Sequence, residues 1–215
     1  MRLQTLPPLL LLLLAPHRSF SQLPPTTKKP AFNILAIIPP ETPLAHVSAW
    51  SLTIPSTSPI SDTLPVLLTP DPNLGTTFYE NGTSETFAAR TSQILTDGVD
   101  DGVPWAITLR SPGQESSQIE LVKGGQGYPG VQVAEWPATV YLETGTFFVC
   151  NVTTSSLSSA VAEDDEENVI ALFWRRKGSR TPEGCSNAEM QAWCVEGGTL
   201  HENSRDSTCY YEEEE

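Results

Sequence analysis

Apolar and polar residues alternate along much of the chain, with the period of two that is typical of β-strands with one buried face. In residues 105–110, Trp105, Ile107 and Leu109 are separated by smaller or polar residues. Residues 169–174 are apolar at every position, which predicts a central strand covered on both faces. Further strands are predicted at 32–38, 47–54, 65–68, 117–123, 131–133, 140–142 and 147–150.

The dipeptide Asn81-Gly82 lies between two strand-like segments, residues 77–80 and 83–87. Asn-Gly is the strongest short-range signal for a two-residue hairpin loop, because both residues tolerate positive φ angles. The sequence therefore predicts a β-hairpin with Asn81 at its tip.

One helix is predicted near the C-terminus. Ser186 begins a Ser-x-x-Glu capping box, and Met190, Trp193 and Cys194 then share one helical face before Gly197. Many short strands and one late helix predict a mainly β fold: an antiparallel β-sandwich or barrel with one short C-terminal helix.

The N-terminus has the layout of a signal peptide. Arg2 supplies a positive charge, residues 9–15 are apolar, and the small residues Ser19 and Ser21 precede a cleavage site. The apolar run is far shorter than the roughly 20 residues that span a bilayer. We expect residues 1–21 to be removed and the protein to be secreted to the extracellular space.

The remaining chain divides by composition. Residues 22–30 are polar and Pro-rich and are expected to form a flexible leader. Residues 31–200 carry the strand patterns and have the size of a single β-rich domain with a substantial core. Residues 201–215 are expected to be an acidic C-terminal tail.

Two features fit an exported protein. The sequons that begin at Asn81 and Asn151 predict N-glycosylation at both residues. The number of cysteines is even, and no two of them form a Cys-x-x-Cys motif. The sequence also has few histidines that could complete a zinc site, so disulfides are favoured over zinc binding. The cysteines are Cys150, Cys185, Cys194 and Cys209.

The formal net charge is −14, which opposes binding to the phosphate backbone of a nucleic acid. About a third of the acidic residues lie in two runs, 163–167 and 212–215, which are typical of solvated segments. No segment after the signal is long and apolar enough to span a membrane. The basic run 175–177 is interpreted as a solvated strand end rather than a processing site.

Two motifs resemble ligand-binding loops. Residues 125–130 match G-x-G-x-x-G, but a strand-like segment follows instead of the helix that a dinucleotide site needs, so we interpret them as a hairpin loop. Residues 97–102 resemble the start of a calcium loop, but Val99 stands where an oxygen ligand belongs, and Thr108 stands where a bidentate glutamate should close the site. We predict no metal and no cofactor.

Candidates for catalysis are few. No Gly-x-Ser-x-Gly motif occurs, and His46 and His201 have no obvious partner, so no catalytic residue is predicted. A carboxylate pair is set by position in space rather than by sequence spacing, so a glycosidase stays an alternative.

The five tryptophans raise the question of sugar binding, because an exposed ring can stack on a sugar face. Most of them lie in apolar patterns and are expected in the core. Trp136 is the exception, since Glu135 and Pro137 place it in a loop.

Three segments, Gly145–Cys150, Ala171–Trp174 and Pro182–Cys185, carry a family resemblance. In this order they resemble a family of small, uncharacterised secreted proteins of filamentous fungi, and the segments 32–36 and 78–83 are also similar to that family. The resemblance covers roughly residues 31–195.

The family has no assigned activity, so the resemblance implies no catalytic residues. It implies that Cys150 pairs with Cys185, which leaves Cys194 and Cys209 for a second disulfide. The acidic run 163–167 and the segment 209–211 depart from the family's pattern.

We therefore expect a non-enzymatic extracellular domain that is a binding, cell-wall-associated or effector-like protein, and a monomer. Its partners would be a cell-wall polysaccharide or a host extracellular protein. The alternative is a secreted glycoside hydrolase that uses a carboxylate pair.

Overall fold

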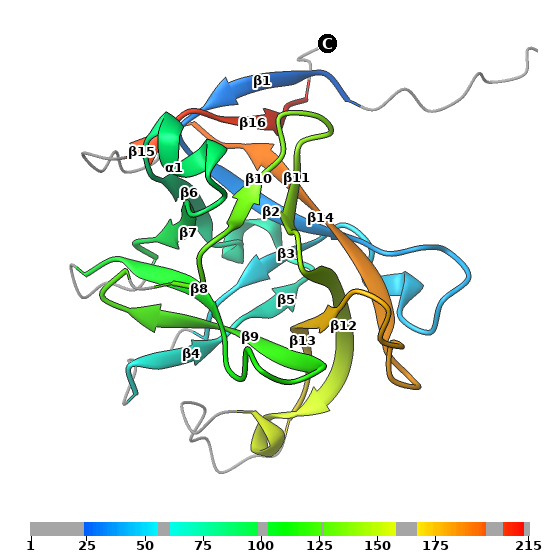
Figure 1. Cartoon of the computed structure of the whole chain (residues 1–215). Helices are drawn as coiled ribbons and strands as arrows, with labels where there is room; N and C mark the ends of the chain where they lie inside the picture. The colour runs from blue at the N-terminus through cyan, green and yellow to red at the C-terminus, as the bar shows by residue number, and fades with distance from the viewer. Residues whose placement is uncertain are drawn as a thin grey trace, which may run out of the picture.

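The structure is a computed structural model that describes residues 24–55, 61–98, 103–125, 127–157, 167–196 and 204–212. The expected signal peptide, His201, most of the acidic run 163–167 and the last three glutamates lie outside these residues. Strands far outnumber helices in the described part of the chain, which confirms the predicted mainly β fold (Figure 1).

The strands are β1 (Thr26–Lys29), β2 (Phe32–Ile37), β3 (Trp50–Thr53), β4 (Thr63–Pro65), β5 (Leu67–Thr69), β6 (Thr77–Asn81), β7 (Gln93–Thr96), β8 (Trp105–Leu109), β9 (Ser116–Lys123), β10 (Val131–Val133), β11 (Thr139–Leu142), β12 (Gly145–Thr153), β13 (Asn168–Arg176), β14 (Ser186–Cys194), β15 (Ser204–Arg205) and β16 (Ser207–Tyr210). The helices are α1 (Ser84–Ala88) and the short 3₁₀ turns η1 (Ala45–Val47), η2 (Pro72–Leu74) and η3 (Thr154–Ser156).

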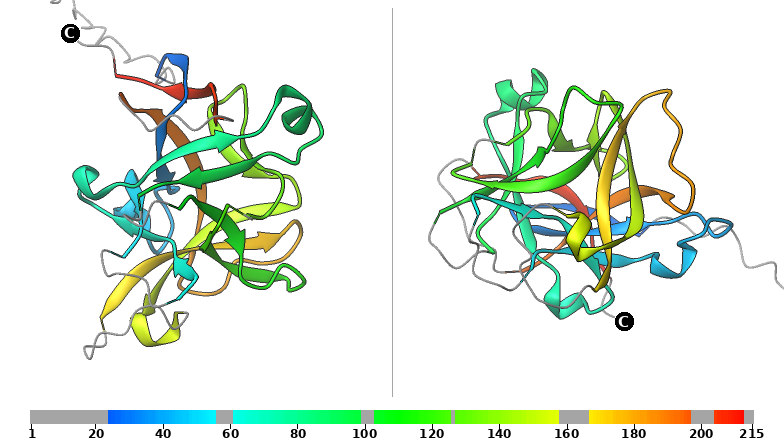
Figure 2. Two further views of the ribbon diagram at one scale, coloured as in Figure 1. Left: turned by 90° about the vertical axis from the view of Figure 1, so that its left-hand side faces the viewer. Right: turned by 90° about the horizontal axis from the view of Figure 1, so that it is seen from below.

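Six strands pair edge to edge in a closed ring, in the order β2–β3–β5–β13–β12–β14 and back to β2. Every pair in the ring is antiparallel. Because the last strand pairs with the first, these strands form a barrel, one of the two expected architectures. The further views show the strands curving around the core (Figure 2).

A second group of strands, β6–β7–β8–β9, extends this ring on one side. It continues from β2 and returns to β13, and β4 pairs with β9. Since β13 has β12 at one edge and β5 and β9 at the other, it is the central strand that its apolar pattern predicted.

The hydrophobic core consists of one main cluster of buried side chains. On β2, the buried residues Phe32, Ile34 and Ala36 alternate with partly exposed ones, as the period of two predicted. Burial of each large apolar side chain stabilises the fold by about 1.5–3 kcal/mol relative to exposure. Such burial decides which face of each strand points inward.

The predicted C-terminal helix is wrong, because its residues form strand β14. β14 pairs with β2 from Glu189 to Cys194 and turns Met190 and Ala192 into the core. A capping box contributes only about 1 kcal/mol. Pairing at both edges and core packing therefore outweigh the local helix signal.

The predicted hairpin at Asn81-Gly82 is also wrong. Asn81 ends β6, which lies between β7 and β15, and helix α1 follows. Thr83 caps α1: its hydroxyl accepts a hydrogen bond from the Thr86 N–H at 3.3 Å. The Thr86 hydroxyl accepts one from the Thr83 N–H at 2.8 Å, which completes a capping box built from two threonines.

Strands also form in the two segments expected to flank the domain. β1 lies in the expected leader, and β16 lies in the expected tail. The two strands pair with each other, and β16 also pairs in parallel with β14. Two short strands that are unstable alone are held here because β14 and a disulfide anchor β16.

Candidate functional site

Trp136 is displayed on the surface by the loop between β10 and β11. Its side chain is 63% exposed, whereas Trp105 and Trp174 are buried in the core. The Ala134 N–H donates to the Thr139 carbonyl at 2.8 Å, which closes the loop at its base. This exposed position agrees with the sequence analysis, which placed Trp136 in a loop because Glu135 and Pro137 flank it.

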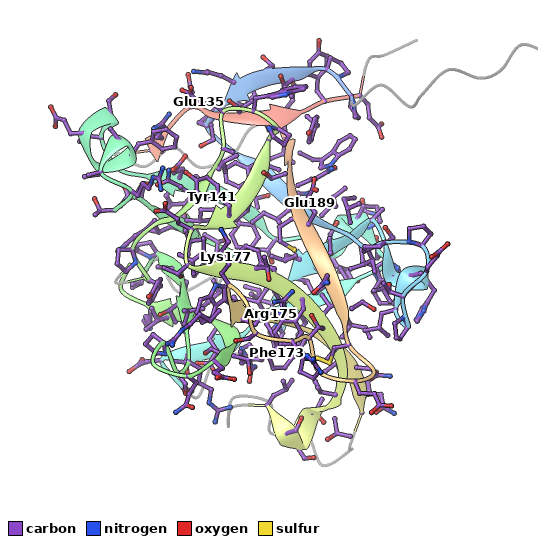
Figure 3. The ribbon with its side chains drawn as sticks, turned by 45° about the vertical axis from the view of Figure 1, so that its right-hand side comes forward. Glu135, Tyr141, Phe173, Arg175, Lys177 and Glu189 are labelled. Atoms are coloured by element: carbon purple, nitrogen blue, oxygen red, sulfur yellow. A yellow bond between two sulfur atoms is a disulfide. The ribbon has the colours of Figure 1, made fainter. Side chains whose placement is uncertain are left out.

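An ion pair lies between this loop and β1. The Lys28 ammonium on β1 is 3.9 Å from the Glu135 carboxylate, and both side chains are more than half exposed. Figure 3 shows Glu135 on the loop next to β1 and β16. Such an exposed pair adds little stability, but it places an ammonium and a carboxylate at the loop that carries Trp136.

A groove of about 630 Å³ lies at the same end of the molecule. Its walls come from β1, from the end of β14 and from the residues that follow β16. The Lys29 ammonium is 3.8 Å from the Glu196 carboxylate at its rim. The lining residues are Thr27, Lys29, Trp193, Cys194, Val195, Glu196, Tyr211 and Glu212.

Strand β1 separates the groove from the Trp136 loop. Lys28 points to Glu135, whereas its neighbours Thr27 and Lys29 line the groove. Successive side chains of a strand point to opposite faces, so the two features occupy the two faces of β1. The sequence interpretation missed this arrangement because it treated residues 22–30 as a leader.

The Cys194–Cys209 disulfide joins the end of β14 to β16 beside the groove. The second disulfide, Cys150–Cys185, ties the chain before β14 to β12. These are the two pairs that the family resemblance implied. Trp193 packs against the buried Tyr210 with ring centroids 5.8 Å apart, so the disulfide and this ring pair fix the groove's wall.

A buried carboxylate anchors the C-terminal strands. Glu80 is fully buried; Ser92 donates to one of its oxygens at 2.9 Å and Ser207 to the other at 2.8 Å. The Arg205 guanidinium lies 3.8 Å away. Burial raises the pKa of Glu80 above the ordinary 4.5, and the two hydroxyls and Arg205 oppose part of that rise. The sequence pattern did not single out any of these residues.

The glycine loop after β9 has a structural role in the residues described. A Cβ on Gly127 would lie 2.7 Å from the Ala106 Cβ and 2.7 Å from the Ile107 carbonyl oxygen. Gly130 has a φ of +87°. The loop leads into strand β10, but the predicted hairpin is wrong, because among the described strands β9 pairs with β8, β4 and β13, whereas β10 pairs with β11. The missing side chain at Gly127 lets the loop approach β8 closely.

The acidic loop after β7 is described only as far as Gly98. There Asp97 accepts a hydrogen bond from the Tyr79 hydroxyl at 3.2 Å. Burial first, and then the negative charge of Asp97, raise the pKa of Tyr79. Within the described residues, no three His, Cys, Asp or Glu side chains are grouped as a metal site would require.

Two arginines of the basic run at the end of β13 form hydrogen bonds within the protein. Arg175 donates to Asn187 at 3.2 Å, and Arg176 donates to the Gly113 carbonyl at 3.4 Å. Figure 3 shows Arg175 and Lys177 with Phe173, Tyr141 and Glu189 along one outer face. These contacts agree with the interpretation as a strand end.

The two sequons differ in accessibility. Asn151 is exposed on β12, while Asn81 is partly buried between its strand partners Gln93 and Ser204. Glycosylation of either residue stays a prediction. His46 is exposed, with its ring at the edge of the Trp50 ring.

In the described part of the chain, no helix is long and apolar enough to cross a bilayer.

Comparison with known proteins identifies a family whose description assigns no function. Residues 46–194 match the family described as "Domain of unknown function (DUF7907)". The chain is 28% identical over 152 residues to "Antigenic protein SchS34" of Stachybotrys chartarum. That match covers 63% of this chain and 66% of the relative, slightly under two thirds of its length. No solved structure matches. The chain therefore belongs to the DUF7907 family of domains of unknown function.

Proposed function

We propose that this protein is a secreted, non-enzymatic domain that binds an extracellular polysaccharide of the cell wall through Trp136. The observation that carries the proposal is the exposed indole on a closed loop whose Glu135 pairs with Lys28. The face of an indole carries negative charge density and attracts the C–H face of a sugar ring. The ammonium and carboxylate of that pair can bond to sugar hydroxyls.

The isolation of Trp136 favours a sugar over a protein partner. Among the residues that the structure describes, Trp136 and Leu74 are the exposed large hydrophobic side chains. A protein interface normally has a contiguous apolar centre. A single ring among polar groups is better suited to a hydroxylated ligand.

Three observations support an extracellular location. The protein has two disulfides, which persist in oxidising compartments. Residues 1–21 have the pattern of a signal peptide. The relative from Stachybotrys chartarum is named as antigenic.

The test is co-sedimentation of the full mature chain with insoluble β-1,3-glucan and with chitin. We expect Trp136→Ala to lower the affinity roughly tenfold, the loss that corresponds to one stacked aromatic ring. Leu74→Ala is the matched control, since Leu74 is 62% exposed on η2 and should not affect binding. Equal binding by wild type and Trp136→Ala would overturn the proposal.

The same samples test the alternative of a glycoside hydrolase. Glu80 is fully buried and out of reach of a substrate, whereas Glu196 and Glu212 line the groove. Release of reducing ends that Glu196→Gln or Glu212→Gln abolishes would establish hydrolysis. We expect binding without release.

A further inference from the structure

We infer that a chain of hydrogen bonds links the buried Glu80 to Tyr141 at the surface and acts as a proton-dependent switch. The protonation state of the Glu80 carboxyl group decides whether the Tyr141 hydroxyl is free to donate or free to accept a hydrogen bond. This switch lies beyond the proposed function and is independent of polysaccharide binding.

The chain passes through two further buried side chains. The Ser92 hydroxyl oxygen lies 2.9 Å from Glu80 Oε1 and 3.1 Å from Gln132 Oε1. The Gln132 amide nitrogen donates to the Tyr141 hydroxyl at 2.6 Å. Glu80, Ser92 and Gln132 are at most 1% exposed, whereas Tyr141 is partly exposed on β11 (Figure 3). The chain therefore connects the core to the surface.

Ser92 cannot donate to both of its neighbours in the chain. A serine hydroxyl has one O–H to donate and lone pairs that can accept. The oxygen of Gln132 is an acceptor, and so is the carboxylate of an ionised Glu80. Each of the three links in the chain needs its own proton, and a link without one leaves a buried polar group unsatisfied, which is costly in the low-dielectric interior. The number of protons therefore decides the direction of every link.

One of the two arrangements that satisfy all three links has a protonated Glu80. The carboxyl group then donates to Ser92, and Ser92 donates to Gln132 Oε1. The amide nitrogen of Gln132 donates to the Tyr141 oxygen.

The other arrangement has an ionised Glu80, and every donor in the chain is reversed. Tyr141 donates to Gln132 Oε1, the amide nitrogen of Gln132 donates to Ser92, and the Ser92 hydroxyl donates to the carboxylate. The two arrangements differ by one proton, which Glu80 exchanges with solvent, and by a half-turn of the Gln132 amide group.

The structure has the orientation of Gln132 that belongs to the protonated state, since the amide nitrogen faces Tyr141 and the oxygen faces Ser92. The second oxygen of Glu80 fits the same state. Ser207 donates to Glu80 Oε2 at 2.8 Å, so a proton on Oε1 leaves Oε2 as the acceptor that this bond needs. Burial raises the pKa of Glu80 above the ordinary 4.5, which moves the transition toward neutral pH.

One charged group favours the ionised state. The Arg205 guanidinium on β15 lies 3.8 Å from Glu80 Oε2. The other described neighbours of the carboxyl group are uncharged: Ser92 and Ser207 bond to it, and Ile94 is opposite Glu80 on β7. Burial and Arg205 therefore act in opposite directions, and the switch responds to pH instead of being fixed in one state.

The result of the switch is a change at Tyr141. When Glu80 is protonated, the Tyr141 oxygen accepts from Gln132, and its own O–H is free to donate. When Glu80 is ionised, that O–H is used within the protein, and the oxygen is left to accept. The charged neighbour at this end is Arg90, which pairs with Glu143 in both states. A group that approaches Tyr141 from solvent therefore meets a donor at low pH and an acceptor at high pH.

The experiment is an NMR pH titration of the isotope-labelled full mature chain. Three signals are followed: the carboxyl carbon of Glu80, the amide nitrogen of Gln132 and the hydroxyl-bearing carbon of Tyr141. In wild type, we expect all three to shift with one common midpoint above the ordinary carboxyl pKa of 4.5. Glu80→Gln can donate like the protonated acid and cannot ionise, so the Gln132 and Tyr141 signals should stay at their acid-limit positions in this variant.

Two serine variants separate the switch from a general response to pH. Ser92→Ala breaks the chain, so Glu80 should still titrate while the Tyr141 signal loses its shift. Ser207→Ala is the matched control, because it also removes a hydroxyl from Glu80 but lies outside the chain and should keep the coupled shift. Thermal unfolding shows which variants are folded, and Glu80→Gln provides the test if Ser92→Ala is not.

Three results would overturn the switch. The first is a Glu80 carboxyl group that does not titrate while the protein is folded. The second is a wild-type Gln132 or Tyr141 signal that does not follow the Glu80 midpoint. The third is a Tyr141 shift that persists unchanged in Glu80→Gln or in folded Ser92→Ala.

Discussion

The Ser207 hydroxyl donates a hydrogen bond of 2.8 Å to the Glu80 carboxylate, although 127 positions separate the two residues. The bond joins the C-terminal segment to β6, and Arg205 pairs with Glu80 across β15 and β6. A buried carboxylate that must be ionised at neutral pH costs stability unless its partners compensate. Here the partners compensate only in part, because the pKa of Glu80 stays raised.

The raised pKa has a defined effect on stability. The folded state holds the Glu80 proton more tightly than the unfolded state does. The stabilising effect is fully present below the ordinary carboxyl pKa of 4.5 and is lost as pH rises through the folded-state pKa. Acidification from neutral pH should therefore increase the contribution of this residue to the free energy of unfolding.

Glu80→Gln tests this pH dependence. Denaturant unfolding of wild type and variant at a series of pH values should give a difference that changes with pH, with the variant relatively more stable as pH rises. All other acids are common to both proteins, so the difference isolates Glu80. Parallel stability curves would contradict the assignment.

Gly127 is predicted to tolerate no side chain. A Cβ there would meet the Ala106 Cβ and the Ile107 carbonyl at 2.7 Å, and neither can move without shifting β8. Gly127→Ala should lower the free energy of unfolding by about 1–3 kcal/mol. Gly113→Ala is the matched control, since a Cβ at Gly113 has no neighbour within 4 Å. Similar effects of the two changes would refute this account of the loop.

The Cys150–Cys185 disulfide is predicted to contribute strongly to stability. It closes a span of 35 residues between β12 and the chain before β14. Replacing both cysteines by alanine should lower the free energy of unfolding by about 2–5 kcal/mol. His46→Ala, at an exposed position, should change it by less than about 0.5 kcal/mol. An unfolding midpoint unchanged by loss of the disulfide would show that β12 and β14 hold without it.

The sequence predicted the parts of the fold that depend on local alternation. Strand β10 has the predicted bounds, β13 is central, and Trp136 is exposed, because each depends on the residue and its immediate neighbours. The mainly β class follows from the same signal.

The errors occurred where distant segments decide the conformation. The Ser186 capping box is outweighed by pairing with β2, which lies about 150 residues earlier in the chain. Asn81-Gly82 is flanked by β7 and β15 instead of a hairpin partner. β1 has a polar sequence typical of a leader and becomes ordered because β16 lies beside it.

The candidate site was predictable only in part. Trp136 was identified from its neighbours, but the groove combines residues 27–29, 193–196 and 211–212. The contact between them depends on the β1–β16 pairing and the Cys194–Cys209 disulfide. No sequence period connects such distant segments.

The most direct test of the central claim is to follow the indole N–H signals of the five tryptophans by NMR during titration with a glucan or chitin hexasaccharide. Trp→Phe variants assign each signal. The account predicts that the Trp136 signal shifts first and most, and that the buried Trp105 and Trp174 stay in place. Saturating ligand that leaves the Trp136 signal unchanged would contradict the claim that this end of the barrel binds polysaccharide.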